Sequence, residues 1–307
     1  MGKGALATKL AQAVNCPQDS PPCGECASCS RIERGIHADV QVIAPAADER
    51  TGRMRSEIGI DQVRAMEHTA ALGAYEGKYR VFIIDGVEKM SLEASNALLK
   101  TLEEPQSGVI FLLLSSQEDE LLSTIRSRCQ RLEVKPVPER EMVEILVGEH
   151  GLGTEDAELL ARLSGGRLGW ALTAAKEPRI LGERQQKLDD LLDALESGAE
   201  RRFQVSQGLA SLQSRDRRAL QETLALWLSW WRDLLMLKEG KPELVANRDF
   251  MKALEEKQTE FSTEQVVAVI KETLATKERL MQNASPRIAL DVLMLLLPES
   301  EKARSSS

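Results

Sequence analysis

The sequence has few aromatic residues, few histidines and no long apolar run. Of its 307 residues only 4% are Phe, Trp or Tyr, and three are histidines. A membrane-spanning helix needs about 20 consecutive apolar residues, whereas the longest runs here, Val109–Leu114 and Val292–Leu297, hold six each. The amino-terminal segment also lacks the long apolar stretch of a signal peptide. We therefore expect a cytoplasmic protein with no membrane segment.

Positive charge is outnumbered by negative charge. Lys and Arg number 40 and Asp and Glu number 48, which gives a formal net charge of −8. Proteins that coat nucleic acid on their own usually carry a basic surface, so the composition argues against that class. Apolar residues make up 42% of the chain. That share is enough for two or three modest cores and too high for a chain that is disordered over most of its length.

Cysteine is rare outside one short segment. Four of the five cysteines fall within 14 residues as C-x6-C-x2-C-x2-C, namely Cys16, Cys23, Cys26 and Cys29. In a reducing cytoplasm such crowding argues against disulfides, and a Cys-x2-Cys turn lets two thiolates reach one zinc ion. Four thiolates leave no position for a catalytic water, so the pattern predicts a structural zinc site; a redox or incidental cluster is the alternative. We interpret the nearby His37 as a surface or loop residue.

Helix and strand signals alternate over the first 135 residues. Apolar spacing, such as that of Leu6, Leu10 and Val14, and caps such as Ser91 predict the helices. Apolar or β-branched runs predict the strands. The expected helices are Lys3–Asn15, Asp61–Leu72, a helix between Ser91 and Pro105, and Glu120–Ser127, and the expected strands are Asp39–Ile43, Arg80–Asp85, Val109–Leu114 and Arg131–Val134. Alternating elements of this kind indicate a parallel sheet covered by helices on both faces.

Beyond Pro138 the strand signals stop and helical patterns take over. Short helices are expected at Glu139–His150, Thr154–Leu163 and Gly169–Ala175, followed by long amphipathic helices between Glu183 and Leu297. The stripe formed by Trp227, Trp230, Trp231 and Leu234 is predicted to be core rather than a ligand site. We therefore predict three domains: an α/β domain at residues 1–135 with the cysteine insert at about 16–29, a small helical domain at 136–180, and a helical bundle at 181–307.

A Gly-Lys pair precedes the first predicted helix. Gly2-Lys3-Gly4 matches the end of the phosphate-binding pattern G-x-x-x-x-G-K-[ST], and Asp85 ends a predicted strand where it could hold the water shell of Mg²⁺. However, Gly4 stands where a Ser or Thr would contact Mg²⁺, and Gly86 stands where a carboxylate would polarise the attacking water. The strand and loop that normally precede such a pair are missing from this sequence. We expect an upstream start, a fragment or a fold that tolerates the gap.

The most specific signals are a block reading Asn-Ala-Leu-Leu-Lys-Thr-Leu-Glu-Glu-Pro, which ends at Pro105, and the motif Ser127-Arg128-Cys129. With them the chain resembles the clamp-loader subunits of bacterial DNA polymerase III, which belong to the AAA+ superfamily. The resemblance extends over nearly the whole chain in the right order. Besides the cysteine insert, the matching segments are Gly59–Arg64, Arg80–Glu104, Leu121–Gln130 and Asn283–Asp291.

Within that family the chain resembles the delta-prime type more than the ATP-hydrolysing gamma/tau type, which carries a complete phosphate loop and an Asp-Glu pair at the strand end. The resemblance implies an AAA+ nucleotide-binding-type domain with a zinc insert, a helical lid and an all-α collar bundle. It also implies a place beside gamma/tau and delta subunits in a hetero-pentameric ring that loads the sliding clamp onto primed DNA. Such a subunit is expected to act as part of the polymerase holoenzyme rather than as an independent enzyme, and whether it has enzymatic activity of its own stays open.

The resemblance also assigns roles to single residues. Arg128 would be an arginine finger that reaches the ATP site of a neighbouring subunit; the alternative is an ordinary salt-bridged arginine at a helix end. Gly2, Lys3 and Asp85 would form a degenerate nucleotide site, where binding of ATP and Mg²⁺ is left open. One of Ser115 and Ser116 would be a degenerate sensor of the γ-phosphate, and Arg167 either a second sensor or a surface charge.

Two other functions stay open on the sequence. The first is a gamma/tau-type clamp-loader subunit that hydrolyses ATP itself, against which Gly86 counts. The second is a zinc-dependent nucleic-acid-binding protein, against which the acidic composition and the lack of a basic and aromatic pattern count.

Overall fold

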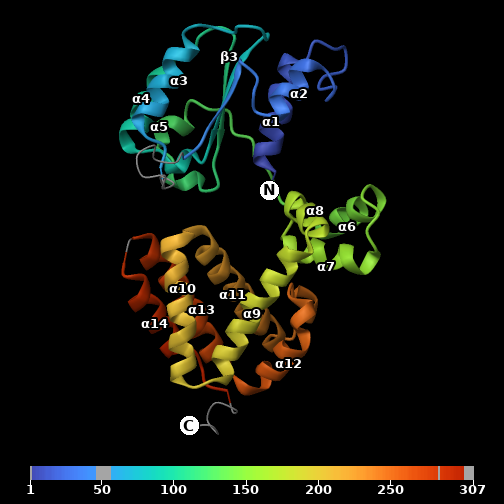
Figure 1. The fold of residues 1–307 in the computed structure, drawn as a ribbon, viewed down its shortest axis with the longest axis vertical. Coiled ribbons are helices and arrows are strands. Elements are labelled where there is room, and N and C mark those ends of the chain that lie inside the picture. Colours follow the sequence, from blue (N-terminus) through green and yellow to red (C-terminus); the bar gives the residue numbers. More distant parts are fainter. Residues whose placement is uncertain (1, 46–56, 283, 301–307) are drawn as a thin grey trace. The chain divides into compact units, whose positions relative to one another are not determined.

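Figure 1 shows the computed structural model, which describes residues 2–45, 57–282 and 284–300. The chain divides into two compact units at the bond between Lys135 and Pro136. Each unit has its own hydrophobic clusters and is described separately below. Asn283, the first residue of the last matching segment, lies outside the described residues.

A parallel sheet of three strands in the order β1-β2-β3 organises the first unit, as the alternating pattern predicts. The strands are β1 (Val40–Ile43), β2 (Arg80–Asp85) and β3 (Val109–Leu114). In the central strand, Val81 pairs with Val40 on one side and Ile110 on the other. Successive side chains of β2 point to opposite faces: Val81 and Ile83 enter one hydrophobic cluster and Phe82 and Ile84 another. The central strand is therefore buried on both faces.

Two helices from the start of the chain cover one face of the sheet (Figure 1). They are α1 (Lys3–Asn15) and α2 (Ala27–Glu33). The bounds of α1 agree with the prediction, but a different side of this helix faces the core. Ala7 and Ala11 are buried, whereas Leu6 and Leu10, whose spacing predicted the helix, are 45% and 43% exposed. Small alanine side chains let the helix axis lie close to the strands, which bulky leucines would prevent.

The opposite face is covered by α3 (Ile60–Ala70) and α4 (Leu92–Glu103). Met66 of α3 and Leu98 of α4 are fully buried in the cluster that contains Phe82. Ser91 caps α4 as predicted, because its hydroxyl accepts a hydrogen bond from the backbone N–H of Ala94 at 3.1 Å. A short helix, α5 (Ser123–Arg126), follows β3 where a longer one was predicted.

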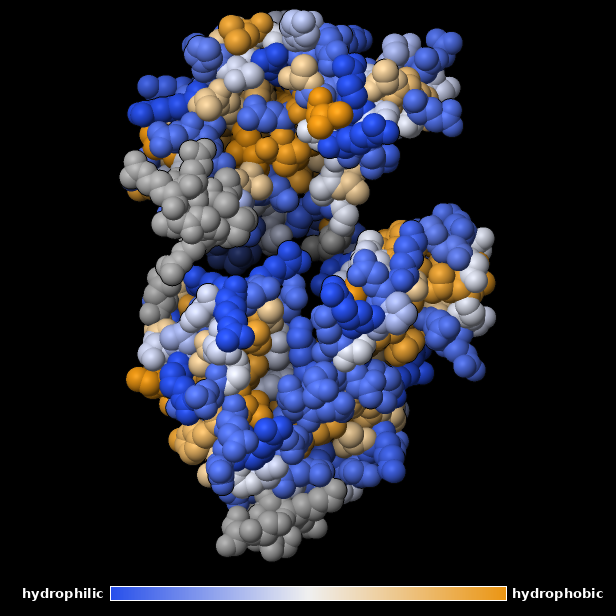
Figure 2. All heavy atoms as spheres, viewed as in Figure 1, coloured by the Kyte–Doolittle hydropathy of each residue, from blue (hydrophilic) through white to orange (hydrophobic). Residues whose placement is uncertain are grey.

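One predicted strand does not form. Residues 131–134 have no strand structure, and the side chain of Leu132 is 75% exposed. Within the described residues β3 pairs only with β2, and all six of its residues are half-buried rather than buried. Figure 2 shows hydrophobic residues on the visible face of this unit, over the part where Figure 1 draws the sheet. A segment forms a strand only when a neighbouring strand accepts its backbone hydrogen bonds, and residues 131–134 have no such neighbour in the part of the chain that the structure describes.

The described part of the second unit contains helices and no strands, and it holds two hydrophobic clusters. The first cluster is formed by α6 (Glu139–Gly148), α7 (Thr154–Ser164) and α8 (Leu168–Lys176), in good agreement with the predicted helices. After α7 the backbone turns at Gly166, whose φ is 81°. A Cβ at this glycine would lie 2.4 Å from Cβ of Pro136, so only glycine fits the turn. The predicted separation of residues 136–180 from 181–307 stays a prediction.

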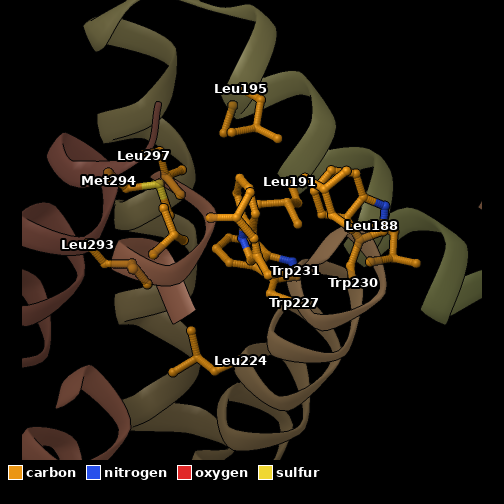
Figure 3. Close-up of a cluster of buried hydrophobic side chains, with 14 of the residues drawn as sticks. Leu188, Leu191, Leu195, Leu224, Trp227, Trp230, Trp231, Leu293, Met294 and Leu297 are labelled. Atoms are coloured by element: carbon orange, nitrogen blue, oxygen red, sulfur yellow. The ribbon is translucent and has the colours of Figure 1, made fainter. Parts of the chain in front are cut away.

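The second cluster is the core of a bundle in which the structure describes six helices. They are α9 (Pro178–Glu196), α10 (Ala199–Arg215), α11 (Arg217–Lys238), α12 (Met251–Glu260), α13 (Thr263–Met281) and α14 (Pro286–Leu296). Trp227, Trp230 and Trp231 of α11 are at most 1% exposed, which confirms that the aromatic stripe is core. Figure 3 shows these rings among leucines of α9 and residues of α14.

The described helices include none that is both long and apolar enough to cross a bilayer.

Candidate functional site

The four clustered cysteines meet at one point in the structure. Their Sγ atoms all lie within 4.8 Å of one another. Cys16 follows the last residue of α1, and Cys26 is the N-cap of α2, where its sulfur accepts a hydrogen bond from the backbone N–H of Cys29 at 3.4 Å. The sulfurs of Cys16 and Cys23 are 3.7 Å apart, too far for a disulfide bond of about 2 Å. The spacing of four soft ligands around one point fits a tetrahedral metal ion such as Zn²⁺.

The environments of the four thiols differ. Backbone N–H groups of Cys26 and Glu25 lower the pKa of Cys23 to about 7, against a weaker opposing effect of burial. Burial raises the pKa of Cys29 to about 12. Metal ligation requires the thiolate form, and a divalent cation between the sulfurs supplies the positive charge that a buried thiolate needs. The donor set therefore fits a metal ion held by Cys16, Cys23, Cys26 and Cys29.

A polar network lies next to the cysteine segment, and the sequence did not predict it. His37, expected to be a surface or loop residue, lies in the loop between α2 and β1, but it is only 5% exposed, so the surface part of that interpretation is wrong. Its Nδ1 accepts the backbone N–H of Asp39 at 3.1 Å, and its Nε2 lies 3.1 Å from Oγ of Ser28 on α2. Because Nδ1 is an acceptor, the neutral ring carries its hydrogen on Nε2 and donates it to Ser28. His37 is thus a structural link between α2 and the start of β1.

Asp39 is the centre of this network. Its carboxylate accepts backbone N–H groups from Tyr75, Glu76 and Gly77 at 2.6–2.7 Å and the Arg80 guanidinium at 2.9 Å. Burial raises the pKa of Asp39, but these donors together outweigh it and hold the pKa at about 2. The one sequence signal for this network is Arg80, which begins a largely apolar predicted strand. A charged side chain buried in such a strand needs a partner.

The residues of the predicted nucleotide site lie at the carboxyl ends of β2 and β3. Gly2 is the N-cap of α1 in the left-handed region, with φ 69°. The amine of Lys3 donates to Oγ of Ser116 at 3.0 Å, just beyond β3. Asp85 is the exposed last residue of β2 and pairs with the last residue of β3. The structure thus brings Lys3, Asp85 and Ser116 to one end of the sheet.

Glu88 is a further polar residue at this end of the sheet. One of its carboxylate oxygens accepts the backbone N–H of Ser116 at 3.3 Å. The other is buried and has no hydrogen-bond partner among the described residues. Ser115, the other candidate sensor, accepts a hydrogen bond from the backbone N–H of Gln117. Arg167 of the helical unit instead donates to the carbonyl of Ser164 and lies over the ring of Trp170.

Arg128 belongs to a separate cluster. It lies just after α5, and its Nη2 donates to Oε1 of Glu103, the last residue of α4, at 2.5 Å. Its Nη1 donates to the carbonyl of Thr124 at 3.0 Å and to Oγ of Ser127 at 3.3 Å. The side chain of Arg128 keeps 34% of its surface exposed. Glu103 is a partner that the sequence analysis did not identify.

Comparison with known proteins gives consistent matches. The family model described as DNA polymerase III, delta subunit, matches residues 1–138. DNA polymerase III subunit delta' of Bacillus subtilis is 25% identical over 299 residues, which cover 97% of this chain and 88% of that one. Subunit delta' of Escherichia coli is 34% identical over 198 residues, covering 64% of this chain and 56% of that one. Subunit tau of B. subtilis is 32% identical over 246 residues, covering 78% of this chain and 42% of that one.

These matches agree with the motifs on which the resemblance was first based. They confirm that the chain is similar to clamp-loader subunits of the delta-prime type. The chain spans most of the B. subtilis delta' subunit but only about half of the E. coli subunit and less than half of tau.

Proposed function

We propose that this chain, as a clamp-loader subunit of the delta-prime type, works as a largely non-hydrolysing member of the ATP-driven ring that loads the sliding clamp onto primed DNA. In this role it donates Arg128 to the ATP site of a neighbouring subunit. The observation that carries the proposal is the arrangement of Arg128, whose Nη1 is held by Thr124 and Ser127 while its side chain is still one-third exposed. The exposed part of the guanidinium is available to a group outside the chain.

The chemistry of the finger follows from its charge. In phosphoryl transfer, negative charge spreads over the oxygens of the transferred group, and a fixed guanidinium stabilises it by charge-assisted hydrogen bonds. Arginine fingers supplied by a partner contribute about 10³–10⁵ in rate in other systems. Arg128 would therefore lower the barrier at the neighbour's site and take no part in proton transfer, because its guanidinium stays charged at neutral pH.

The proposed lack of ATP hydrolysis by this chain rests on two glycines, which stand where an ATP-hydrolysing subunit carries a Mg²⁺ ligand and a carboxylate that orients water. Gly4 has no hydroxyl to offer Mg²⁺, and Gly86 follows Asp85 where a carboxylate would orient water. The Lys3 amine, which would otherwise contact a phosphate, donates to Ser116. Gly2, Lys3 and Asp85 would then be the remains of a nucleotide site.

The proposed partners come from the relatives. Matches to subunits named delta' and tau support a complex in which this chain sits with gamma/tau and delta subunits in a hetero-pentamer. The sliding clamp and primed DNA would be reached through that complex. We further propose that residues 136–180 form the lid and residues 181–307 the collar of such a subunit, since each region is organised around its own hydrophobic cluster.

The metal is proposed to be structural zinc held by Cys16, Cys23, Cys26 and Cys29. When bound, zinc would crosslink the end of α1 to the start of α2 through four thiolates. The hydrogen bond between Ser28 on α2 and His37 would also hold α2 close to the start of β1. No open ligand position is left for water, so this site would have no catalytic part.

The test is the Arg128→Ala variant in the clamp-loader complex reconstituted with its partner subunits and assayed with clamp and primed DNA. ATP hydrolysis at the neighbouring site should fall by about 10³-fold or more, while gel filtration shows an intact complex. Arg126→Ala is the matched control, because Arg126 is two residues away and pairs only loosely with the exposed Asp119 at 3.7 Å. A normal rate for Arg128→Ala in an intact complex would refute the finger.

A second candidate function is ATP hydrolysis by this chain itself. It is favoured by Lys3 at the first position of α1 and by Glu88, whose second carboxylate oxygen is buried without a partner among the described residues. The isolated chain should show no ATP turnover if our proposal is right. Turnover that disappears in Lys3→Ala would favour the gamma/tau-type function instead.

A further inference from the structure

Arg128 contacts a carboxylate that lies 25 residues earlier in the chain. Oε1 of Glu103 is 2.5 Å from Nη2 of Arg128, so this is a charge-assisted hydrogen bond as well as an ion pair. The other contacts of the guanidinium come from its own turn, the carbonyl of Thr124 and the hydroxyl of Ser127. Among the described residues, Glu103 is therefore the only hydrogen-bond or ion-pair partner of the Arg128 side chain that lies outside its own turn.

The hydrogen-bond pattern leaves part of the guanidinium available. An arginine has five N–H donors. The two on Nη1 point to Thr124 and Ser127, and one on Nη2 points to Glu103. Nε–H and the second hydrogen of Nη2 have no partner among the residues the structure describes. The internal contacts thus fix the orientation of the planar group and leave two donors for an oxyanion outside the chain.

The position of Glu103 adds an electrostatic reason for the pair. Glu103 is the last residue of α4, next to the negative end of the helix dipole, where a carboxylate is unfavourable unless a cation lies beside it. Arg128 supplies that cation. Both side chains are partly exposed, at 34% for Arg128 and 50% for Glu103. Exposed ion pairs add little to folding stability, so this pair is better explained by the geometry it imposes on Arg128 than by the stability it adds.

We propose that Glu103 is a positioning residue that orients Arg128 for its action on the ATP bound by a neighbouring subunit. This inference rests on the proposed finger role of Arg128. Glu103 itself touches neither ATP nor the transferred phosphoryl group. It restricts the guanidinium to one orientation, so that the two available donors meet the phosphoryl oxygens without a search through arginine rotamers.

The experiment compares Glu103→Ala, Glu103→Gln, Arg128→Ala and the double variant in the reconstituted complex with clamp and primed DNA. In Glu103→Ala, kcat at the neighbouring site should fall by about tenfold, while KM for ATP changes less than about twofold, because only the transition state uses the finger. Glu103→Gln keeps an acceptor oxygen of the same reach and should recover most of the rate. In the Arg128→Ala background, Glu103→Ala should cause no further loss.

Glu104→Ala is the matched control, since this neighbouring acidic residue has no ion pair with Arg128. Assembly is checked by gel filtration, and Glu103→Gln is measured alone if Glu103→Ala does not assemble. If Arg128→Ala slows hydrolysis but the Glu103 variants do not, or if Glu103→Ala speeds it, positioning by Glu103 is refuted and the finger stands. A loss that persists in the Arg128→Ala background, or that Glu104→Ala reproduces, refutes it equally. If Arg128→Ala has no effect, the proposed finger itself fails.

Discussion

The cysteine segment at residues 16–33 and the bundle of α9–α14 differ in how much apolar surface they bury. Of the described residues 16–33, only Cys29 and Ile32 are buried apolar residues. The bundle instead buries three tryptophans and many leucines in one continuous cluster (Figure 3). A short segment without a core of its own needs crosslinks or a metal, whereas six packed helices do not. The comparison therefore supports the proposal that the cysteines have a structural role.

The polar contacts of the two regions differ in the same way as their apolar packing. In the bundle, buried Arg202 donates to the carbonyls of Ala194, Leu297 and Pro298, and so closes the ends of two helices that already pack well. Beside the cysteine segment, Asp39 and His37 replace apolar packing with hydrogen bonds to backbone and to Ser28. Polar contacts thus add to a well-packed apolar core in the bundle, whereas beside the cysteine segment they are a main source of stability.

Removal of the metal is expected to have the largest effect. It should unfold the cysteine segment and leave the helices of the bundle folded. The wild-type chain should contain one zinc per molecule, and the Cys26→Ser/Cys29→Ser variant none. Structural zinc contributes about 10–16 kcal/mol to small zinc-dependent folds at pH 7, so the segment should lose its structure and become sensitive to protease. Metal analysis and limited proteolysis measure both results.

Cys129→Ser is the control for this prediction, because Cys129 lies outside the cluster and should leave the zinc content unchanged. The helices of the bundle should also persist in the double variant, as seen by circular dichroism. Full zinc content in Cys26→Ser/Cys29→Ser, or melting of the whole chain, would contradict the comparison.

Truncation of a core tryptophan is expected to have the next largest effect, in the opposite region. Trp231 is fully buried and packs edge-on against Trp230 at 5.1 Å and against Phe261 at 5.9 Å between ring centroids. Trp231→Ala should lower the free energy of unfolding of the bundle by about 3–5 kcal/mol, because it leaves a large cavity. Urea unfolding followed by circular dichroism gives the value.

The zinc content of Trp231→Ala should equal that of the wild type. Ile288→Ala is the matched control, since Ile288 on α14 is 65% exposed and its truncation should change the stability of the isolated chain by less than about 0.5 kcal/mol. A small effect of Trp231→Ala would mean that the bundle does not depend on its aromatic core.

Acid is expected to have the smallest effect, acting through Asp39. The folded state holds the pKa of Asp39 at about 2, below its ordinary value of 3.8. Because the folded-state pKa is the lower one, the stabilisation is complete above about pH 5 and is lost as the pH falls toward 2. A shift of this size corresponds to about 2 kcal/mol.

Urea unfolding of the wild type and of Asp39→Asn between pH 6 and pH 2 measures this contribution. Any loss of zinc in acid affects both proteins, so their difference isolates the carboxylate. The stability difference between them should shrink by about 2 kcal/mol over this range. A constant difference would show that Asp39 does not act through its charge.

Predictions from the sequence agree with the structure where they depend on a single helix or strand. The bounds of α1, the cap at Ser91 and the strand Arg80–Asp85 agree with the structure. The tryptophan stripe on α11 was correctly assigned to the core. Each depends on residues within a few positions of one another, where helical period, capping and strand alternation act directly.

The predictions from the sequence are wrong where the outcome depends on a second part of the chain that packs against the first. The side of α1 that faces the sheet is chosen by close packing of Ala7 and Ala11, and apolar spacing alone favours Leu6 and Leu10. Residues 131–134 form no strand because no neighbouring strand accepts their hydrogen bonds. His37 is buried because Asp39 and Ser28 satisfy its ring, which sequence proximity does not reveal.

By itself, the sequence determined most of the order of helices and strands, the four-cysteine spacing and the motif that contains Arg128, because each is a pattern of near neighbours. It did not reveal α2, and the strand expected at residues 131–134 is absent. Only the tertiary structure decided which distant groups meet. It joins Glu103 to Arg128 across 25 residues and Lys3 to Ser116 across 113. Hydrogen bonds and ion pairs depend on distances of about 3 Å, and such distances between remote residues are set only when the helices pack onto the sheet.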